Sequence, residues 1–301
     1  MKNRSIRPHR GIRNSRADRV FYGVNGVLMA LTFLLYAWPL WFVLIASFSD
    51  PNLVQAGQVL LLPKGFHLGG YKLILEYQDI LRGYLNSILY TVVGTALNLV
   101  MTICAAYPLS RSDFLPRKVL TVLFVFTMYF SGGLIPSYLL IKDLKLMDTI
   151  ASMILPTGIN IMYMLIISNY FKSLPPALEE SAKIDGATDL RILWSVILPL
   201  SLPLLATFTL YYAVERWNEW YLAMLYVKSV QKWPLQNVLR TIINDVNMMA
   251  TQNIPGQAKP DIQGDSIKMS SIIVAMAPIM CLYPFLQRYF LSGLTLGAVK
   301  E

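Results

Sequence analysis

The stretch VFYGVNGVLMALTFLLYAWPLWFVLIASF, residues 20–48, decides the fold class of this 301-residue chain. It contains no charged residue and is longer than the roughly 20 residues that a helix needs to cross the apolar core of a bilayer. It also exceeds the apolar centre of a secretory signal, about 7 to 15 residues, and no cleavage site closes it. We therefore expect this stretch to stay in the protein as a membrane-spanning helix.

The rest of the chain repeats this pattern. Hydrophobic residues make up 55% of the sequence and charged residues only 14%, which is typical of a protein whose solvent is lipid. Six apolar segments are long enough to span, and prolines in or near them are expected to mark kinks or span ends. The prediction is an all-α, polytopic membrane protein with six transmembrane helices, at residues 20–48, 86–109, 119–140, 150–171, 200–225 and 269–291.

Charge predicts the orientation of the chain. The net charge is +9, but seven of the 26 lysines and arginines lie within residues 1–19, directly before the first apolar run. That position is typical of a cytoplasmic anchor and not of a nucleic-acid-binding surface. Because six spans are an even number, both termini are predicted to be cytoplasmic. The domains are then a basic tail (1–19), a membrane domain (20–291) with outer loops at 49–85 and 226–268, and a cytoplasmic C-terminal tail (292–301).

The loop between the fourth and fifth segments, SLPPALEESAKIDGATDLRILWSVILPLSLP (173–203), has the pattern of two short helices. We expect Ser173 to cap the first, with Pro175 and Pro176 in its first turn, and Gly186 to end it. Thr188 or Asp189 can cap the second helix, which Pro199 is expected to end. This helix pair is either an exposed element to which a cytoplasmic partner binds or an amphipathic connector on the membrane surface.

The spacing of residues in this loop distinguishes these two interpretations. Five of seven positions match the coupling signature of ABC importer permeases, which is Glu-Ala-Ala, three residues, Gly, nine residues, Ile, one residue, Leu-Pro; Ser and Val replace one Ala and the Ile. The seven positions of the signature are Glu180, Ser181, Ala182, Gly186, Val196, Leu198 and Pro199, of which Ser181 and Val196 are the two replacements. The chain resembles this family over nearly its whole length, and most closely the second, smaller permease of the maltose-type, carbohydrate branch. Further matching pieces include Asn86-Ser87, Arg111, Trp217-Asn218-Glu219 and the tail from Gly293, in which Leu296 and Glu301 depart from the usual small residues.

The resemblance implies a set of partners for a chain in the bacterial plasma membrane. These are a second homologous permease, a cytoplasmic ATPase dimer that binds ATP and Mg, and an extracytoplasmic solute-binding protein, which can be a lipoprotein. Residues Glu179 to Pro199 would transmit the motion of the ATPase, and the segment 226–268 would reach the binding protein. The chain itself has no phosphate-binding Gly-x-x-x-x-Gly-Lys-Ser/Thr loop, so we expect it to bind no nucleotide.

Charged and aromatic side chains gather within the fifth apolar segment, at residues 211–221. Ionisable groups inside a span usually face protein or water, and aromatic faces suit sugar rings. The candidate substrate pathway is therefore Glu215, Trp217, Asn218 and Glu219, with Glu215 and Glu219 expected on one helix face. The alternative is an aromatic belt at the membrane interface with charges that reach the headgroups.

Other kinds of site find little support in the sequence. Cys104 and Cys281 lie in apolar segments, and the two histidines, His9 and His67, form no metal-ligand pattern. Three alternatives remain: an ABC permease for another solute such as amino acids or polyamines, a membrane enzyme, and a scaffold without transport. The sequence does not identify the sugar, because selectivity resides largely in the binding protein.

Overall fold

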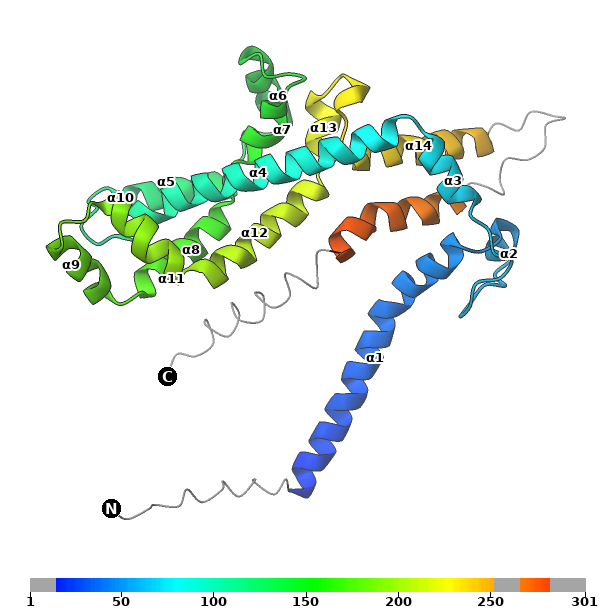
Figure 1. Cartoon of the computed structure of the whole chain (residues 1–301), viewed down its shortest axis with the longest axis horizontal. Helices are drawn as coiled ribbons and strands as arrows, with labels where there is room; N and C mark the ends of the chain where they lie inside the picture. Colours follow the sequence, from blue (N-terminus) through cyan, green and yellow to red (C-terminus); the bar gives the residue numbers. More distant parts are fainter. Residues whose placement is uncertain (1–14, 252–265, 282–301) are drawn as a thin grey trace.

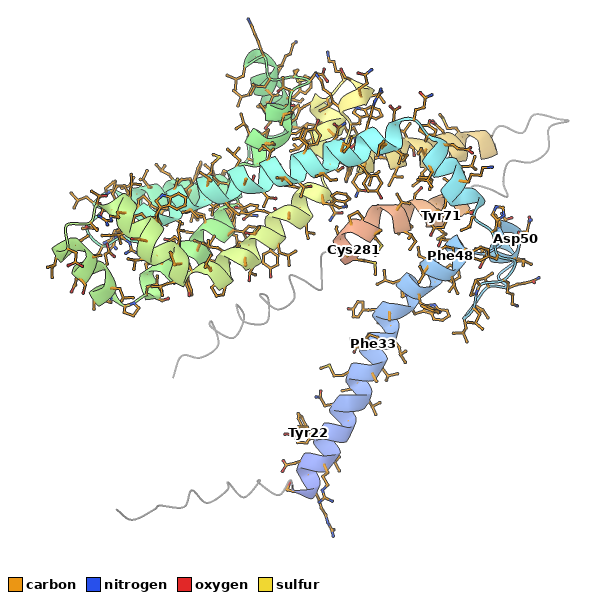
Figure 2. The ribbon with its side chains drawn as sticks, in the orientation of Figure 1. Tyr22, Phe33, Phe48, Asp50, Tyr71 and Cys281 are labelled. Carbon is orange, nitrogen blue, oxygen red and sulfur yellow. The ribbon has the colours of Figure 1, made fainter. Side chains whose placement is uncertain are left out.

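The first helix stands apart from the rest of the molecule. The computed structural model describes residues 15–251 and 266–281, and this part of the chain is helical without strands. α1 (Arg16–Ser47) extends away from the other helices, with Tyr22 and Phe33 projecting from it (Figures 1 and 2). Its N-terminus is closed by a capping box between Ser15 and Asp18. Because nearly all its large apolar side chains are exposed, α1 requires an apolar surrounding.

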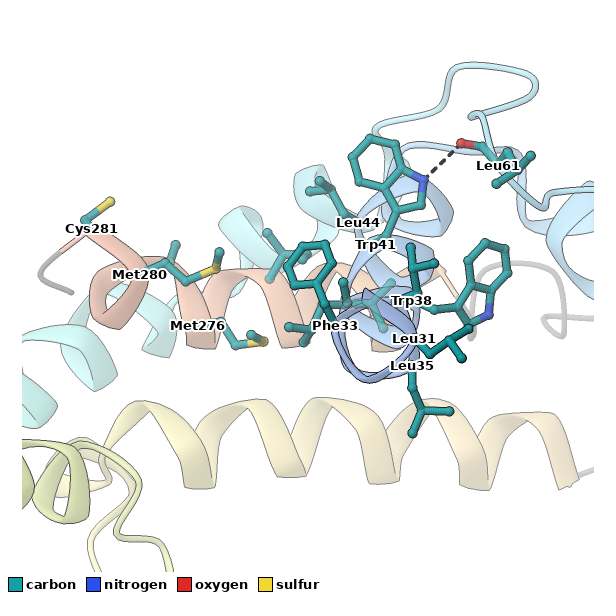
Figure 3. Close-up of a pocket in the computed structure, with 16 residues that line it drawn as sticks. Leu31, Phe33, Leu35, Trp38, Trp41, Leu44, Leu61, Met276, Met280 and Cys281 are labelled. Carbon is teal, nitrogen blue, oxygen red and sulfur yellow. Dashed lines mark hydrogen bonds between the residues drawn. The ribbon is translucent and has the colours of Figure 1, made fainter. Parts of the chain in front are cut away.

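A segment with two short helices joins α1 to the rest of the molecule. The chain folds back through α2 (Pro51–Gln55) and α3 (Gly69–Glu76), where the ring of Tyr71 stacks on Phe48 with centroids 5.3 Å apart. An apolar groove of about 1160 Å³ lies between α1 and the helix Ser266–Cys281 (Figure 3). At its rim the indole N–H of Trp41 donates a 3.0 Å hydrogen bond to the carbonyl of Leu61, which fixes the connecting loop against α1.

α4 (Asp79–Ser110) is the central helix. Its 32 residues make it about 48 Å long at 1.5 Å per residue. α8, α12 and α14 all pack against it (Figure 1). Near its Ser110 end, α4 contributes Ala106, Tyr107 and Leu109 to the largest buried apolar cluster, which also holds Phe171 of α8 and Phe208 of α12.

Segments that the sequence presents as single apolar runs are broken in the structure. The run 119–140 forms α5 (Arg117–Tyr129) and α6 (Leu134–Asp143), which meet at 113°. Gly133 lies at the break with a φ of +87°, a conformation that suits glycine. The run 150–171 forms α7 (Ile150–Ile154), η1 (Leu155–Thr157) and α8 (Ile161–Ser173), with a bend of 57°. Each apolar run therefore predicts a helical segment but not its straightness.

The second half of the chain forms short helices around α4. These are α9 (Pro176–Ile184), α10 (Asp189–Ile192), η2 (Leu193–Ile197), α11 (Leu198–Leu200), α12 (Leu202–Trp217), α13 (Tyr221–Tyr226), η3 (Val230–Lys232), α14 (Leu235–Thr251) and the helix Ser266–Cys281. Within the described residues, α1 and α4 are each long and apolar enough to cross a membrane, and up to five spans result if every bent pair counts as one. The sixth predicted span, 269–291, lies partly outside the described residues, as do most of the tail 1–19 and all of the tail 292–301. The count of six and the side of the termini stay predictions.

Asp148 joins two loops that are distant in sequence. Its carboxylate accepts hydrogen bonds from the backbone N–H of Lys228 and Ser229, from the Ser229 hydroxyl and from the Lys232 ammonium, which lies 2.8 Å from Oδ2. The residue has a φ of +60°, in the left-handed region that aspartate tolerates better than most residues. The Lys232 hydrogen bond first, and then those from Ser229, hold the pKa of Asp148 well below its ordinary value.

We predict that Asp148→Asn lowers the thermal stability of the chain at neutral pH. A folded-state pKa below the unfolded one stabilises the protein above about pH 4, and this stabilisation is lost as the pH falls below that value. The difference in Tm between the native chain and Asp148→Asn should therefore shrink as the pH is lowered through 4. Melting of the detergent-purified chain across pH measures it, with exposed Asp143→Asn as the matched control. A constant difference at all pH values would contradict the role of the charge.

Candidate functional site

The first helix of loop 173–203 has a well-defined start and stop. Pro176 occupies its first turn and Glu179 lies early, where the helix dipole favours an anion. At the other end Gly186 has a φ of +76°, and its N–H and that of Ala187 donate to the carbonyls of Lys183 and Ala182. These two bonds form a Schellman motif, which needs a residue with positive φ at this position. The predicted stop at Gly186 is confirmed.

The predicted cap at Ser173 is wrong. Its hydroxyl donates to the carbonyl of Tyr170 at 2.8 Å, so it closes α8 and does not start α9. Pro175 takes the capping position of α9 and makes no side-chain hydrogen bond. The sequence did not distinguish the two roles, because Ser173 lies between two helices and a serine can either close the first or cap the second.

The second helix of the loop is longer than expected. Thr188 precedes it, as predicted, but without a side-chain capping bond, and the helix continues past Pro199 to Leu200. Residues 193–197 widen into a π turn, in which the N–H of Leu198 donates to the carbonyl of Leu193. A proline lacks the N–H for the usual bond and its ring crowds the carbonyl four residues back, so the wider turn lets Pro199 remain in the helix.

An ion-pair network fixes this helix pair to the Ser110 end of α4. Arg111 pairs with Glu179, and the side chains of both are largely buried, 13% and 15% exposed. The same guanidinium donates to the Phe171 carbonyl at 3.1 Å and to the Ser110 hydroxyl at 2.8 Å, and lies 5.0 Å from the Tyr107 ring centre. Arg111 thus joins α4, α8 and α9 at one point.

Lys183 extends this network to two further carboxylates. Its ammonium lies 3.3 Å from oxygens of Glu179 and of Asp113, and 4.0 Å from Asp189 on the second helix. Burial disfavours the charged lysine, but its hydrogen bonds to Asp113 and Glu179 outweigh this and raise the pKa of Lys183. The pKa of Asp113 is lowered, first by its own backbone N–H and then by Lys183. Alternating charges therefore bind both helices of the loop into one rigid unit.

The signature residues divide between two faces of this unit. Ala182, Val196 and Leu198 pack against the buried apolar cluster near Phe171, so they hold the loop in place. The remaining signature positions are exposed: Glu180, Ser181, Gly186 and Pro199. Beside them four large apolar side chains point outward, Leu178, Ile184, Leu190 and Trp194, and Ile184 is 86% exposed. Exposed apolar side chains next to charged ones are typical of a surface that contacts another protein.

The fifth apolar segment places its charged residues differently from the prediction. α12 ends at Trp217, so Glu219 lies beyond the helix and does not share a helical face with Glu215. Instead the Glu219 carboxylate accepts from the backbone N–H of Tyr221 and of Leu222, which caps the start of α13. Glu215 accepts a 2.6 Å hydrogen bond from the Tyr163 hydroxyl of α8. The expectation of one face was wrong because it assumed an uninterrupted helix.

Three of the four predicted pathway residues nevertheless line the same hollow. Glu215, Asn218 and Glu219 line a hollow of about 320 Å³ together with Thr157, Arg216 and Trp220. Trp217 is not among its lining residues: it is 6% exposed, and its indole N–H donates to the carbonyl of Ala275 at 3.0 Å. Its ring packs near Tyr84 of α4, so it holds the helix Ser266–Cys281 against the body of the molecule.

Arg216 has a role that the sequence did not reveal. It is 6% exposed, and its guanidinium donates to three carbonyls, those of Met153, Ile154 and Thr157, and to the side-chain oxygen of Asn98. Gly94 provides the space, because a Cβ there would lie 2.9 Å from the Arg216 side chain. The only signal in the sequence was an arginine inside an apolar segment, which is rare unless its charge is satisfied by protein groups.

The chain is similar to known proteins over nearly its whole length. The family described as "Binding-protein-dependent transport system inner membrane component" matches residues 11–295. Protein LplC of Bacillus subtilis (strain 168) is 40% identical over 95% of this chain and 97% of its own length. A polygalacturonan/rhamnogalacturonan transport system permease protein, YtcP, of the same organism is also 40% identical, over 96% of this chain and its full length. A crystal structure of a bacterial ABC transporter involved in the import of the acidic polysaccharide alginate is similar with a TM-score of 0.81, at 33% identity, over 93% of this chain and 99% of that chain.

The fold and the loop define a helical membrane transport component. The family match covers most of the chain, and the relatives agree over nearly their whole lengths. The chain belongs to the family of binding-protein-dependent transport system inner membrane components, the permeases of ABC transporters. The resemblance seen in the sequence is confirmed at the level of the family.

We predict that Glu179→Gln loosens loop 173–203, whereas Glu180→Gln does not. Removing the Glu179 charge leaves the largely buried Arg111 guanidinium without its anion, which costs about 2 kcal/mol. Glu180 is adjacent in sequence and exposed, so its amide variant is the matched control. Thermal unfolding in detergent, together with limited proteolysis of the loop, measures the effect. Equal melting and equal proteolysis of the two variants would show that the ion pair does not hold the loop.

Proposed function

We propose that this chain is a permease subunit of an ATP-driven, binding-protein-dependent importer of carbohydrates, oligosaccharides in particular. It crosses the bacterial plasma membrane six times with both termini cytoplasmic, and it forms the translocation pathway with a second homologous permease. A cytoplasmic ATPase dimer holds ATP and Mg, and an extracytoplasmic binding protein, which can be a lipoprotein, delivers the solute to the segment 226–268. This chain binds no nucleotide itself.

The observation that carries this proposal is the form of loop 173–203. Its two helices are fixed to α4 through Arg111 and Glu179 and present Glu180, Ser181, Gly186 and Pro199 at their exposed surface. A rigid element can transmit the displacement of a docked partner, whereas a flexible loop would absorb it. We therefore assign Glu179 to Pro199 as the element that couples this chain to the ATPase.

The assignment of carbohydrate as the cargo rests on the relatives. The names of YtcP and of the alginate importer refer to polysaccharides. That of AraQ of Bacillus subtilis (strain 168), which is 25% identical over 89% of this chain, refers to arabinooligosaccharides. The hollow lined by Glu215, Asn218 and Glu219 offers polar groups that exchange hydrogen bonds with hydroxyls, and it is our candidate for part of the pathway. A permease for amino acids or polyamines is the runner-up, because the coupling signature is shared among importers.

Purification with the products of neighbouring genes tests the proposal. The tagged chain, isolated in mild detergent, should retain a second permease and an ATPase, as identified by mass spectrometry. ATP hydrolysis by this complex should rise when a binding protein and one oligosaccharide are added. A chain that purifies without any ATPase would support the scaffold or membrane-enzyme alternatives, and stimulation by amino acids alone would support the runner-up.

We predict that Gly186→Val uncouples ATP hydrolysis from uptake. The φ of +76° at Gly186 is strained for a β-branched residue by roughly 1–2 kcal/mol, so the turn between the two helices should distort although no atom blocks the new side chain. Gly57→Val is the matched control, because Gly57 has a φ of +68°, an equally open surrounding and a position remote from the loop. Uptake per ATP hydrolysed in proteoliposomes should fall for Gly186→Val only. Normal coupling in both variants would refute the assignment of the loop.

A further inference from the structure

A second hollow shares Trp220 as a lining residue with the first. It has a volume of about 280 Å³, and its walls come from α14, from Trp220 before α13, and from the helix Ser266–Cys281. Its polar lining residues are Gln236, Arg240 and Ser271, and its apolar lining includes Leu239 and Ile243. This volume is just below that of typical ligand pockets, about 300–1,000 Å³, so it suits one sugar unit of a longer chain.

Arg240 is held in place without losing its hydrogen-bond donors. Its guanidinium carbon lies over the ring of Trp220, 4.1 Å from the centre, in a cation–π contact. Stacking on an aromatic face fixes the plane of the guanidinium and leaves its N–H groups free to point outward from the ring. Arg240 is exposed, and no ion pair with a carboxylate is seen for it among the described residues.

The two hollows differ in the charge of their lining residues. Among the described residues no carboxylate lines the Arg240 hollow, whereas Glu215 and Glu219 both line the other one. Ser271 also lines the Arg240 hollow, is 2% exposed, and its hydroxyl has no hydrogen-bond partner in the described structure. A buried hydroxyl without a partner is costly, and a ligand oxygen would satisfy it.

We propose that Trp220, Arg240 and Ser271 form a subsite for the carboxylate-bearing unit of an acidic oligosaccharide. The guanidinium pairs with the carboxylate through its fork of donors, the Ser271 hydroxyl bonds a ring oxygen or hydroxyl, and the apolar wall covers the face of the sugar ring. Glu215 and Glu219 repel the carboxylate from the other hollow, so the two hollows differ in the charge of the group that they accept. This inference rests on the proposed function and narrows its cargo to uronate-containing chains.

The test compares acids with their esters. The chain is reconstituted in proteoliposomes with its partner permease, ATPase and binding protein, and uptake is measured for oligouronates from polygalacturonan and from alginate, each as the free acid and as the methyl ester. Arg240→Gln should lower uptake of the acid about tenfold while uptake of the ester changes little, because only the acid loses a charge-assisted bond. The same binding protein serves every variant, so its own preference for acid or ester cancels in the ratio to the native chain.

Controls separate this inference from the proposed function. Arg82→Gln removes an exposed cation from the Asp79 end of α4 and should leave the acid-to-ester ratio unchanged. Arg240→Lys retains the charge but lacks the planar fork, so the ratio should fall by a smaller factor, and it carries the test if the glutamine variant does not assemble. Equal loss of acid and ester uptake in the Arg240 variants would overturn the subsite and indicate a role in docking the binding protein. A native complex that imports no carbohydrate at all would refute the proposed function, and the subsite with it.

Discussion

The hydrogen bonds of Arg216 are the interaction on which the membrane part of this structure depends. The break between α7 and α8 interrupts the regular hydrogen bonding of a helix, and carbonyls at such a helix end need donors from elsewhere. A buried guanidinium has the opposite need, because it requires acceptors wherever water is absent. Arg216 donates to the carbonyls of Met153, Ile154 and Thr157, so each group meets the requirement of the other. Asn98 of α4 accepts a further bond, which places three helical segments around one cation.

How much of this arrangement could be predicted depends on whether its cause is local in sequence. The length of α1, the proline start of α9 and the glycine stop at Gly186 follow from residues within a few positions of one another, and the structure confirms them. The bend at Gly133 and the π turn before Pro199 also have local causes, but composition alone does not say whether a proline ends a helix or widens it.

The remaining features come from groups that are far apart in the chain. Glu219 was placed on the face of Glu215 by its spacing, yet the backbone N–H groups of Tyr221 and Leu222 draw its carboxylate to the start of α13. Arg240 lies 20 residues beyond Trp220 and contacts it only through the packing of α14. The spacing of residues along the sequence does not predict such contacts, because it shows which residues share a helix face but not which other helix packs against that face.

α4 connects the two surfaces to which partners are assigned. At its Ser110 end Arg111 and the hydroxyl of Tyr107 bond to loop 173–203, the latter through the carbonyl of Asp189 at 3.2 Å. Toward its Asp79 end the side chains of Asn86 and Tyr90 donate to backbone carbonyls of residues 231–233, and Ser87 accepts from the N–H of Leu235.

These bonds attach the segment that precedes α14 as firmly as the loop at the other end. A helix of 32 residues held by hydrogen bonds near both ends moves as one body more easily than it bends, since bending would break its internal bonds. Displacement of loop 173–203 therefore has a direct mechanical route to α14, and through it to the hollow that contains Arg240.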